Sequence, residues 1–276
     1  MVGPRGRWRR GGGRAGARHP RHARLGRAMT APIRLLVTRP LPQGQEFAAA
    51  LAARWPDRFD PVFWPLLHIE QEPAPLELEG VQALMFTSAN GVAAFARASD
   101  RRDLPALCVG EGTAEAARRA GLAAESADGD AGALARLAAA AWLPGGGDLL
   151  HVRGRDSAGD LAGALRAEGI GVREVILYSA RATGSVPPDI TALLAEGGID
   201  AVTLFSPRSA RILAAFAVEA AGAGRGWALD RASAIAISPA AAAPLTGLGF
   251  ARIITAPRPD RAGMLAALDG LAPMRP

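Results

Sequence analysis

Short apolar runs alternate with alanine-rich stretches along most of this chain of 276 residues. Apolar runs bounded by Gly, Pro or Asn are typical of buried strands, and their alternation with helical patterns predicts βαβ units and parallel sheets. We expect strands at 33–38, 60–66, 82–87, 106–109, 148–152, 172–178, 200–205, 233–237 and 251–255. We expect helices at 43–55, 89–98, 111–121, 131–142, 157–168, 189–196, 207–219, 239–247 and 260–269. The predicted fold class is therefore α/β.

The second half of the chain repeats the order of motifs in the first half. The repeated pairs of segments are 35–40 with 149–154, 83–90 with 201–208, and 106–110 with 234–238. Three matches in the same order favour an internal duplication, which predicts two similar parallel-sheet α/β domains. A cleft between two such domains is a common place for a ligand. The other interpretation is that βα units resemble one another in any α/β protein.

The two places where the repeats differ predict how the domains are connected. The segments 61–67 and 172–178 occupy the same place in their halves, each after the first βαβ unit. If the halves exchange partners there, the chain crosses twice between the domains. Domain one would comprise 33–67 and 180–270, and domain two would comprise 68–178.

The basic charge is concentrated at the start of the chain. The formal net charge is +6, but residues 1–28 hold nine Arg and no acidic residue, so the rest carries −3 (+6 minus 9). Residues 1–30 have too few apolar side chains to fold by themselves. Three origins stay open for this tail: a start assigned upstream of Met29, a disordered tail without function, or a patch for nucleic acid or membrane. We expect a chain that starts at Met29 to keep its fold and activity.

Several functional classes lack their sequence signatures. No stretch of about 18 apolar residues runs without a charge or a break, and no secretory signal is recognisable, so we expect a cytoplasmic protein without a membrane partner. The four His and the single Cys show no metal-ligand spacing. Phosphate-binding glycine loops and nucleophile motifs are missing. We therefore expect no metal and no cofactor, and a structural role for His151.

Several predicted strands end in small hydroxyl residues or Gly just before a helix. In parallel sheets these strand ends face the ligand crevice, and the free N–H groups of the helix starts bind anions such as carboxylates. Ser and Thr also cap helices, which is the alternative interpretation. The candidate ligand contacts are Thr87, Ser88, Asn90, Gly110, Thr113, Ser206, Ser209 and Ser238.

Two further residues at strand ends carry candidate chemistry. Arg153, which with Arg155 ends a predicted strand, would bind a carboxylate through its paired N–H groups, unless the segment is a solvated turn. Tyr178 is the only tyrosine in the chain. It ends a strand at the predicted domain crossing, where its hydroxyl either faces the cleft or packs half-buried.

Together these motifs resemble the uroporphyrinogen-III synthase family. The motifs that carry the resemblance are 37–40, 86–92, 109–114, 150–154, 172–178, 204–210 and 236–238, within a similarity that spans about 33–270. The resemblance implies two α/β domains joined by a two-stranded connector, with the active site in the cleft between them. It also implies an enzyme of haem biosynthesis that needs neither metal nor cofactor.

The resemblance implies a specific reaction. Enzymes of this family cyclise the linear tetrapyrrole hydroxymethylbilane to uroporphyrinogen III, invert ring D and release water. Loss of the ring A hydroxyl gives an azafulvene, which ring D attacks at its substituted carbon to form a spiro intermediate that fragments and recloses. The family's tyrosine, which assists departure of the hydroxyl, falls on Tyr178, and Thr87, Ser88, Thr113 and Ser206 match positions expected to touch the tetrapyrrole.

One departure from the family and two alternative functions stay open. Many members carry Thr after the last Gly/Ser-Pro turn, where this chain has Ala240 and Ala241, so Ser238 would have to replace that hydroxyl. The chain would otherwise be a cofactor-free two-domain module that binds a polycarboxylate. A nucleic-acid-binding function rests only on the tail, and we expect none. We expect a monomer, with at most transient contact with the preceding pathway enzyme.

Overall fold

The computed structural model describes residues 31–156 and 159–271. The expectations for the tail 1–30 lie outside these ranges. Within them the strands form two separate sheets, here called sheet A and sheet B. None of the helices in the described part of the chain is long and apolar enough to cross a membrane.

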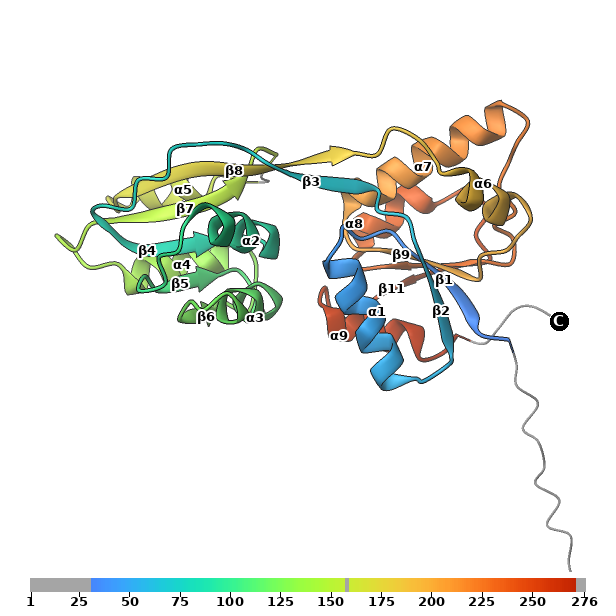
Figure 1. Ribbon diagram of the computed structural model, residues 1–276, viewed down its shortest axis with the longest axis horizontal. Coiled ribbons are helices and arrows are strands. Elements are labelled where there is room, and N and C mark those ends of the chain that lie inside the picture. The colour runs from blue at the N-terminus through green and yellow to red at the C-terminus, as the bar shows by residue number, and fades with distance from the viewer. Residues whose placement is uncertain (1–30, 157–158, 272–276) are drawn as a thin grey trace, which may run out of the picture. The chain divides into compact units, whose positions relative to one another are not determined.

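Sheet A is entirely parallel, with the strand order β11-β10-β9-β1-β2. Its strands are β1 (Ile33–Val37), β2 (Phe59–Phe63), β9 (Ala201–Leu204), β10 (Ser233–Ala236) and β11 (Arg252–Thr255). Its helices are α1 (Gln43–Arg54), α6 (Pro188–Ala195), α7 (Pro207–Gly222), α8 (Pro239–Ala242), the 3-10 helix η1 (Ala243–Leu245) and α9 (Arg261–Leu268). Helices α1 and α9 cover one face, and α6, α7 and α8 with η1 cover the other (Figure 1).

Sheet B has the strand order β3-β8-β7-β4-β5-β6 and is parallel except for the pair of β3 with β8. Its strands are β3 (Leu67–Gln71), β4 (Val81–Phe86), β5 (Ala106–Cys108), β6 (Ala124–Ser126), β7 (Asp148–Gly154) and β8 (Val172–Ala182). Its helices are α2 (Ala89–Ala98), α3 (Glu111–Arg119), α4 (Ala131–Ala141) and α5 (Leu161–Ala167). Helices α2 and α3 pack on one face, and α4 and α5 pack on the other.

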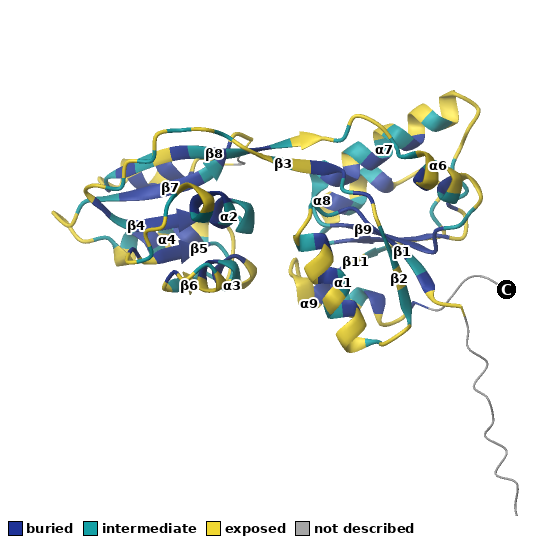
Figure 2. Cartoon of the chain, in the orientation of Figure 1, coloured by how far each residue is buried: buried dark blue, intermediate teal, exposed yellow. Residues whose placement is uncertain are grey.

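The apolar runs form central strands because both faces of each sheet are covered. On β7, Leu150 and Val152 join the core under α2 and α3, whereas Leu149 joins the core under α4 and α5. Figure 2 shows the central strands of each sheet in the colour of buried residues. Strands buried on both faces are typical of parallel sheets in α/β proteins, and the predicted fold class is confirmed.

Two expected helices differ from the structure, and two strands of the structure were not expected. Strands β3 and β6 were not expected, because each offers too few apolar residues to stand out from a loop. The helix expected at 157–168 begins only at Leu161, since Asp160 caps it by accepting a hydrogen bond of 2.7 Å from the Gly163 N–H. The helix expected at 239–247 ends after one turn and continues as η1, where Pro244 has no N–H to donate.

The chain crosses from one sheet to the other twice. Strand β3 follows the first crossing, and β8 precedes the second. Strand β2 belongs to sheet A and β3 to sheet B, whereas β8 belongs to sheet B and β9 to sheet A. The C-terminal part of β8 pairs antiparallel with β3, from Leu67 opposite Ala182 to Gln71 opposite Tyr178. This strand membership supports the discontinuous domains 33–67 with 180–270 and 68–178. The domain boundaries, the connector and the duplication themselves stay predictions.

Candidate functional site

A cavity of about 780 Å³ lies at the ends of strands from both sheets. Its lining includes the residues that follow β4 and β5, at the starts of α2 and α3. Five of the candidate ligand contacts line it, namely Thr87, Ser88, Asn90, Gly110 and Thr113. The strand ends of a parallel sheet are where such folds bind their ligands.

The start of α2 joins helix capping to the cavity wall. Phe86 ends the buried strand β4, and Ser88 then adopts an extended backbone, so that its Oγ accepts a hydrogen bond of 3.0 Å from the Asn90 N–H. The same Oγ lies 3.0 Å from the Tyr178 hydroxyl, with which it shares a hydrogen bond. Ser88 therefore caps the helix and also holds the phenol.

Tyr178 contacts Ser88 at the start of α2 and Gly154 at the end of β7. It lies on β8, is partly buried, and packs its ring against Gly154 at the end of β7. A Cβ atom on Gly154 would lie 2.7 Å from the Cε2 atom and 2.8 Å from the Cζ atom of Tyr178. Burial raises the pKa of Tyr178, and its hydrogen bonds with Ser88 and the Gly154 backbone oppose this shift. Tyr178 itself is not among the residues that line the cavity.

The start of α3 presents backbone N–H groups to the cavity. Gly110 is the extended N-cap residue, and the carbonyl of Gly110 accepts the N–H groups of Thr113 and Ala114. A Cβ atom on Gly110 or Gly112 would meet nothing within 4 Å, so the backbone is open on this side. The free amides and dipole of a helix start attract anions such as carboxylates. The carboxylate of Glu111 in the first turn opposes this attraction. Arg118 partly neutralises that carboxylate, because its Nη1 lies 2.6 Å from Glu111 Oε1.

Three candidate serines, Ser206, Ser209 and Ser238, do not line the cavity, and Ser206 and Ser238 cap helices instead. Ser206 accepts a hydrogen bond of 3.0 Å from the Ser209 N–H at the start of α7, and their hydroxyls lie 2.9 Å apart. Ser238 accepts the Ala241 N–H at 3.4 Å at the start of α8. The alternative that these hydroxyls serve as caps agrees with this geometry.

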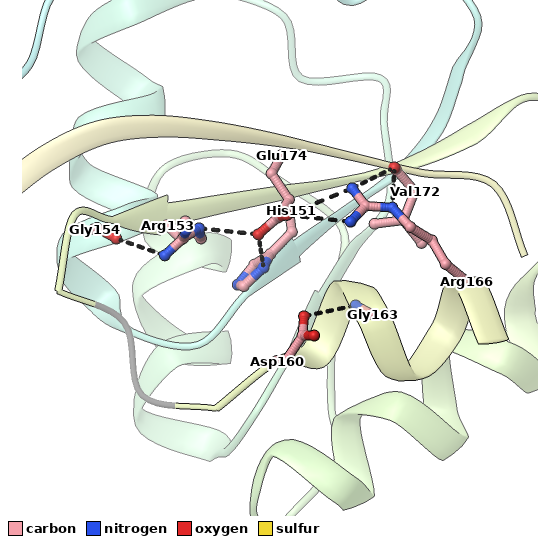
Figure 3. Close-up of polar contacts among 8 residues, drawn as sticks. All are labelled: His151, Arg153, Gly154, Asp160, Gly163, Arg166, Val172 and Glu174. Carbon is pink, nitrogen blue, oxygen red and sulfur yellow. Dashed lines mark hydrogen bonds and ion pairs between the residues drawn. The ribbon is translucent and has the colours of Figure 1, made fainter.

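Arg153 also lies outside the cavity lining, and its guanidinium already has an acidic partner. Its Nε lies 2.9 Å from Glu174 Oε1 on the neighbouring strand β8 (Figure 3). The same carboxylate lies 3.7 Å from His151 Nδ1 and 3.4 Å from Arg166 Nη1. Burial lowers the pKa of His151 to about 4, so His151 is neutral at physiological pH, as its expected structural role requires.

Arg39 lines the cavity at the end of β1, although it was not among the candidate residues. The Cζ atom of its guanidinium lies 4.6 Å from the centre of the Phe205 ring. Burial lowers the pKa of Arg39, Glu46 raises it and Arg261 lowers it further.

The described residues contain neither a metal-binding cluster nor a reactive thiol. No group of three His, Cys, Asp or Glu within 31–156 and 159–271 is placed to hold a metal ion. Cys108 is buried, and burial raises the pKa of its thiol to about 12, which makes it a poor nucleophile at neutral pH.

The comparisons with known proteins decide the family. Residues 46–266 match the family model described as uroporphyrinogen-III synthase HemD. The chain belongs to this family. No curated protein matches the chain. The crystal structure of uroporphyrinogen-III synthetase from Helicobacter pylori matches with a TM-score of 0.56 at 14% identity, covering 85% of this chain and 97% of that chain.

A second solved structure is similar to the chain at a lower TM-score. A mutant uroporphyrinogen III synthase from Thermus thermophilus matches with a TM-score of 0.47 at 21% identity, covering 87% of this chain and 100% of that chain. The Helicobacter match supports the fold, and the family match supports the function. The chain is thus a uroporphyrinogen-III synthase, an enzyme of haem biosynthesis.

The predicted internal repeat of the sequence also indicates Arg39 as a candidate ligand contact. The predicted repeat aligns Arg39 with Arg153, since each follows an apolar run at the end of the first strand of its half. Arg153 was preferred as the carboxylate ligand because a second Arg follows it. The structure shows that Arg153 has Glu174 beside it and that Arg39 faces the cavity. Of these two arginines, Arg39 is the one that lines the cavity.

Proposed function

We propose that the cavity is the active site in which this synthase closes hydroxymethylbilane to uroporphyrinogen III. The observation that carries the proposal is the contact between Ser88 and Tyr178. It joins the one phenol of the chain to the start of a helix that lines the cavity. Thr87, Asn90, Gly110 and Thr113 would contact the tetrapyrrole from the same wall.

Tyr178 is proposed to protonate the leaving hydroxyl. Because Ser88 Oγ accepts the Asn90 N–H, its own hydroxyl proton is free to point at the Tyr178 oxygen. Tyr178 does not line the cavity, so it reaches the substrate only if the site changes on binding. The phenolic proton is then available to the ring A hydroxymethyl group. The C–O bond breaks, the hydroxyl leaves as water with this proton, and the electron pair of the pyrrole nitrogen forms the azafulvene.

Ring D then closes the macrocycle. Its substituted carbon attacks the azafulvene carbon to give the spiro intermediate. The original bond between ring D and its methylene bridge then breaks, and the bridge carbon rebinds at the unsubstituted carbon of ring D. The proton lost from ring D in the last step restores the Tyr178 phenol, so protons and electrons balance over the cycle. The enzyme must fix the orientation of ring D, and this task depends on positioning more than on acid strength.

The helix starts are proposed to bind the carboxylates of the substrate. Hydroxymethylbilane carries eight carboxylates, and α2 and α3 both begin at the cavity wall. Ser206, Ser209, Ser238 and Arg153 would contact the substrate only if the site changes on binding, because they do not line the cavity. The expected cytoplasmic location, the monomeric state and a transient contact with the preceding pathway enzyme remain proposals.

Incubation with hydroxymethylbilane tests the proposal. The substrate closes without a catalyst to the unrotated isomer I, so isomer III in excess over a protein-free control reports catalysis. A module that only binds polycarboxylates would leave isomer I as the product. The Gly222→Ala variant, which alters the end of α7 where a Cβ atom meets nothing within 4 Å, serves as a folding control.

A further inference from the structure

Arg39 occupies a distinctive place in the cavity wall. It follows the buried strand β1, is partly buried, and lies with its guanidinium 4.6 Å from the centre of the Phe205 ring. Phe47 on α1 packs edge-on against the same ring, with the ring centres 4.9 Å apart. All three residues line the cavity. A guanidinium that lies over an aromatic ring keeps the N–H groups at its rim available for other partners.

This guanidinium has no acidic partner among residues 31–156 and 159–271. No hydrogen bond or ion pair joins it to a described residue. Glu46 is close enough to raise the pKa of Arg39, but its carboxylate lies 3.6 Å from Arg119. A partly desolvated charge without a counter-charge is costly to keep in a folded protein.

The other arginines of similar placement are paired. Arg153, which the predicted repeat aligns with Arg39, lies 2.9 Å from Glu174. Arg54 lies over the ring of Trp55 at 4.7 Å, as Arg39 lies over Phe205, but it also pairs with Asp269 at 2.6 Å. Arg39 therefore differs from them in offering an uncompensated charge, and it offers that charge to the cavity.

We propose that Arg39 anchors one carboxylate of the tetrapyrrole by a bidentate ion pair. This inference rests on the proposed active site. The carboxylate supplies the counter-charge that Arg39 lacks among residues 31–156 and 159–271, and the planar fork of the guanidinium fixes the direction of the bound side chain. Arg39 acts on binding and orientation and takes no part in the loss of water.

Replacement of Arg39 should weaken binding without removing the chemistry. The Arg39→Met variant loses a pair of charge-assisted hydrogen bonds to the substrate. Its KM should therefore rise about 10- to 100-fold, with kcat within about threefold of the wild type. Arg39→Lys keeps the charge but loses the fork, and its KM should fall between the two. Arg54→Met, which removes a stacked arginine outside the cavity lining, should leave KM unchanged.

Two further readouts separate ligand binding from a structural role. The affinity for uroporphyrin III, a stable octacarboxylate, should fall with Arg39→Met in a fluorescence titration. The ligand-free variant should melt at or above the wild-type temperature, because the change removes a charge that has no partner. An unchanged KM and uroporphyrin affinity would overturn the inference, and so would a melting temperature clearly below the wild-type value.

The outcomes also separate this inference from the proposed function. If the wild type makes no isomer III, the proposed active site is wrong, and the uroporphyrin titration still decides whether Arg39 binds a carboxylate. If the wild type makes isomer III and Arg39→Met matches it in KM and affinity, only the role of Arg39 is wrong.

Discussion

A single methyl group added at Gly154 should displace the proposed catalytic tyrosine. The Cβ atom of Gly154→Ala would lie 2.7 Å from Tyr178 Cε2 and 2.8 Å from Cζ, where real contacts begin near 3.4 Å. The ring must therefore shift by about 0.7 Å, or the end of β7 must give way by that amount. Overpacking of this kind typically costs about 1–3 kcal/mol of folding stability.

The shift matters because the hydrogen bond that holds the phenol tolerates only a small increase in length. The Tyr178 hydroxyl lies 3.0 Å from Ser88 Oγ. A displacement of about 0.7 Å along this contact would take it beyond hydrogen-bond distance. We expect turnover to fall by about 10-fold or more, since a misplaced proton donor loses much of the benefit of general acid catalysis.

The assay measures isomer III formation from hydroxymethylbilane, with thermal melting as the check on folding. Gly222→Ala is the matched control, because its added Cβ atom meets nothing within 4 Å. Wild-type turnover by a folded Gly154→Ala variant would refute the argument that the position of Tyr178 governs the rate. A crystal structure of the variant in which neither the tyrosine nor the end of β7 has moved would refute the packing argument separately.

Two further predictions concern titration. Tyr178 is the only tyrosine, so the ultraviolet absorbance of tyrosinate reports it alone, and its midpoint should lie above the ordinary value near 10 because burial raises its pKa; a midpoint at or below 10 would contradict this. His151 has a folded-state pKa lowered from 6.5 to about 4, so the unfolded chain binds the proton first as pH falls. The free energy of unfolding should therefore drop between pH 6.5 and pH 4 by up to about 3 kcal/mol, and urea titrations of His151→Leu should lack this part of the drop.

Much of the fold could be predicted because its determinants are local. A buried parallel strand is a continuous apolar run, and the start of a helix is set by a single cap, as Ser88 sets the start of α2. Strand β3 escaped prediction because only Leu67 and Ile69 are apolar in it, and it is stabilised by pairing with the distant β8. No local pattern carries that information.

The candidate site was only partly predictable, because its contacts are between distant segments. The approach of Gly154 to Tyr178 depends on a register shift between β7 and β8, which the sequence does not display. Likewise, two arginines at equivalent strand ends look alike until the position of Glu174 shows that one of them is paired. The hydroxyls after β4 line the cavity because parallel strands end at a common edge, and their contact with substrate stays a prediction.

The most direct test of the account is the reaction of Tyr178→Phe with hydroxymethylbilane, read by separation of isomers I and III. The wild type should give isomer III, and the variant should still give isomer III but with turnover reduced about 10- to 100-fold, at the low end of general acid catalysis because the azafulvene forms readily. The variant should stay folded and bind uroporphyrin III as the wild type does. Wild-type turnover by Tyr178→Phe would show that the phenol only packs, and isomer I as the sole wild-type product would contradict the function itself.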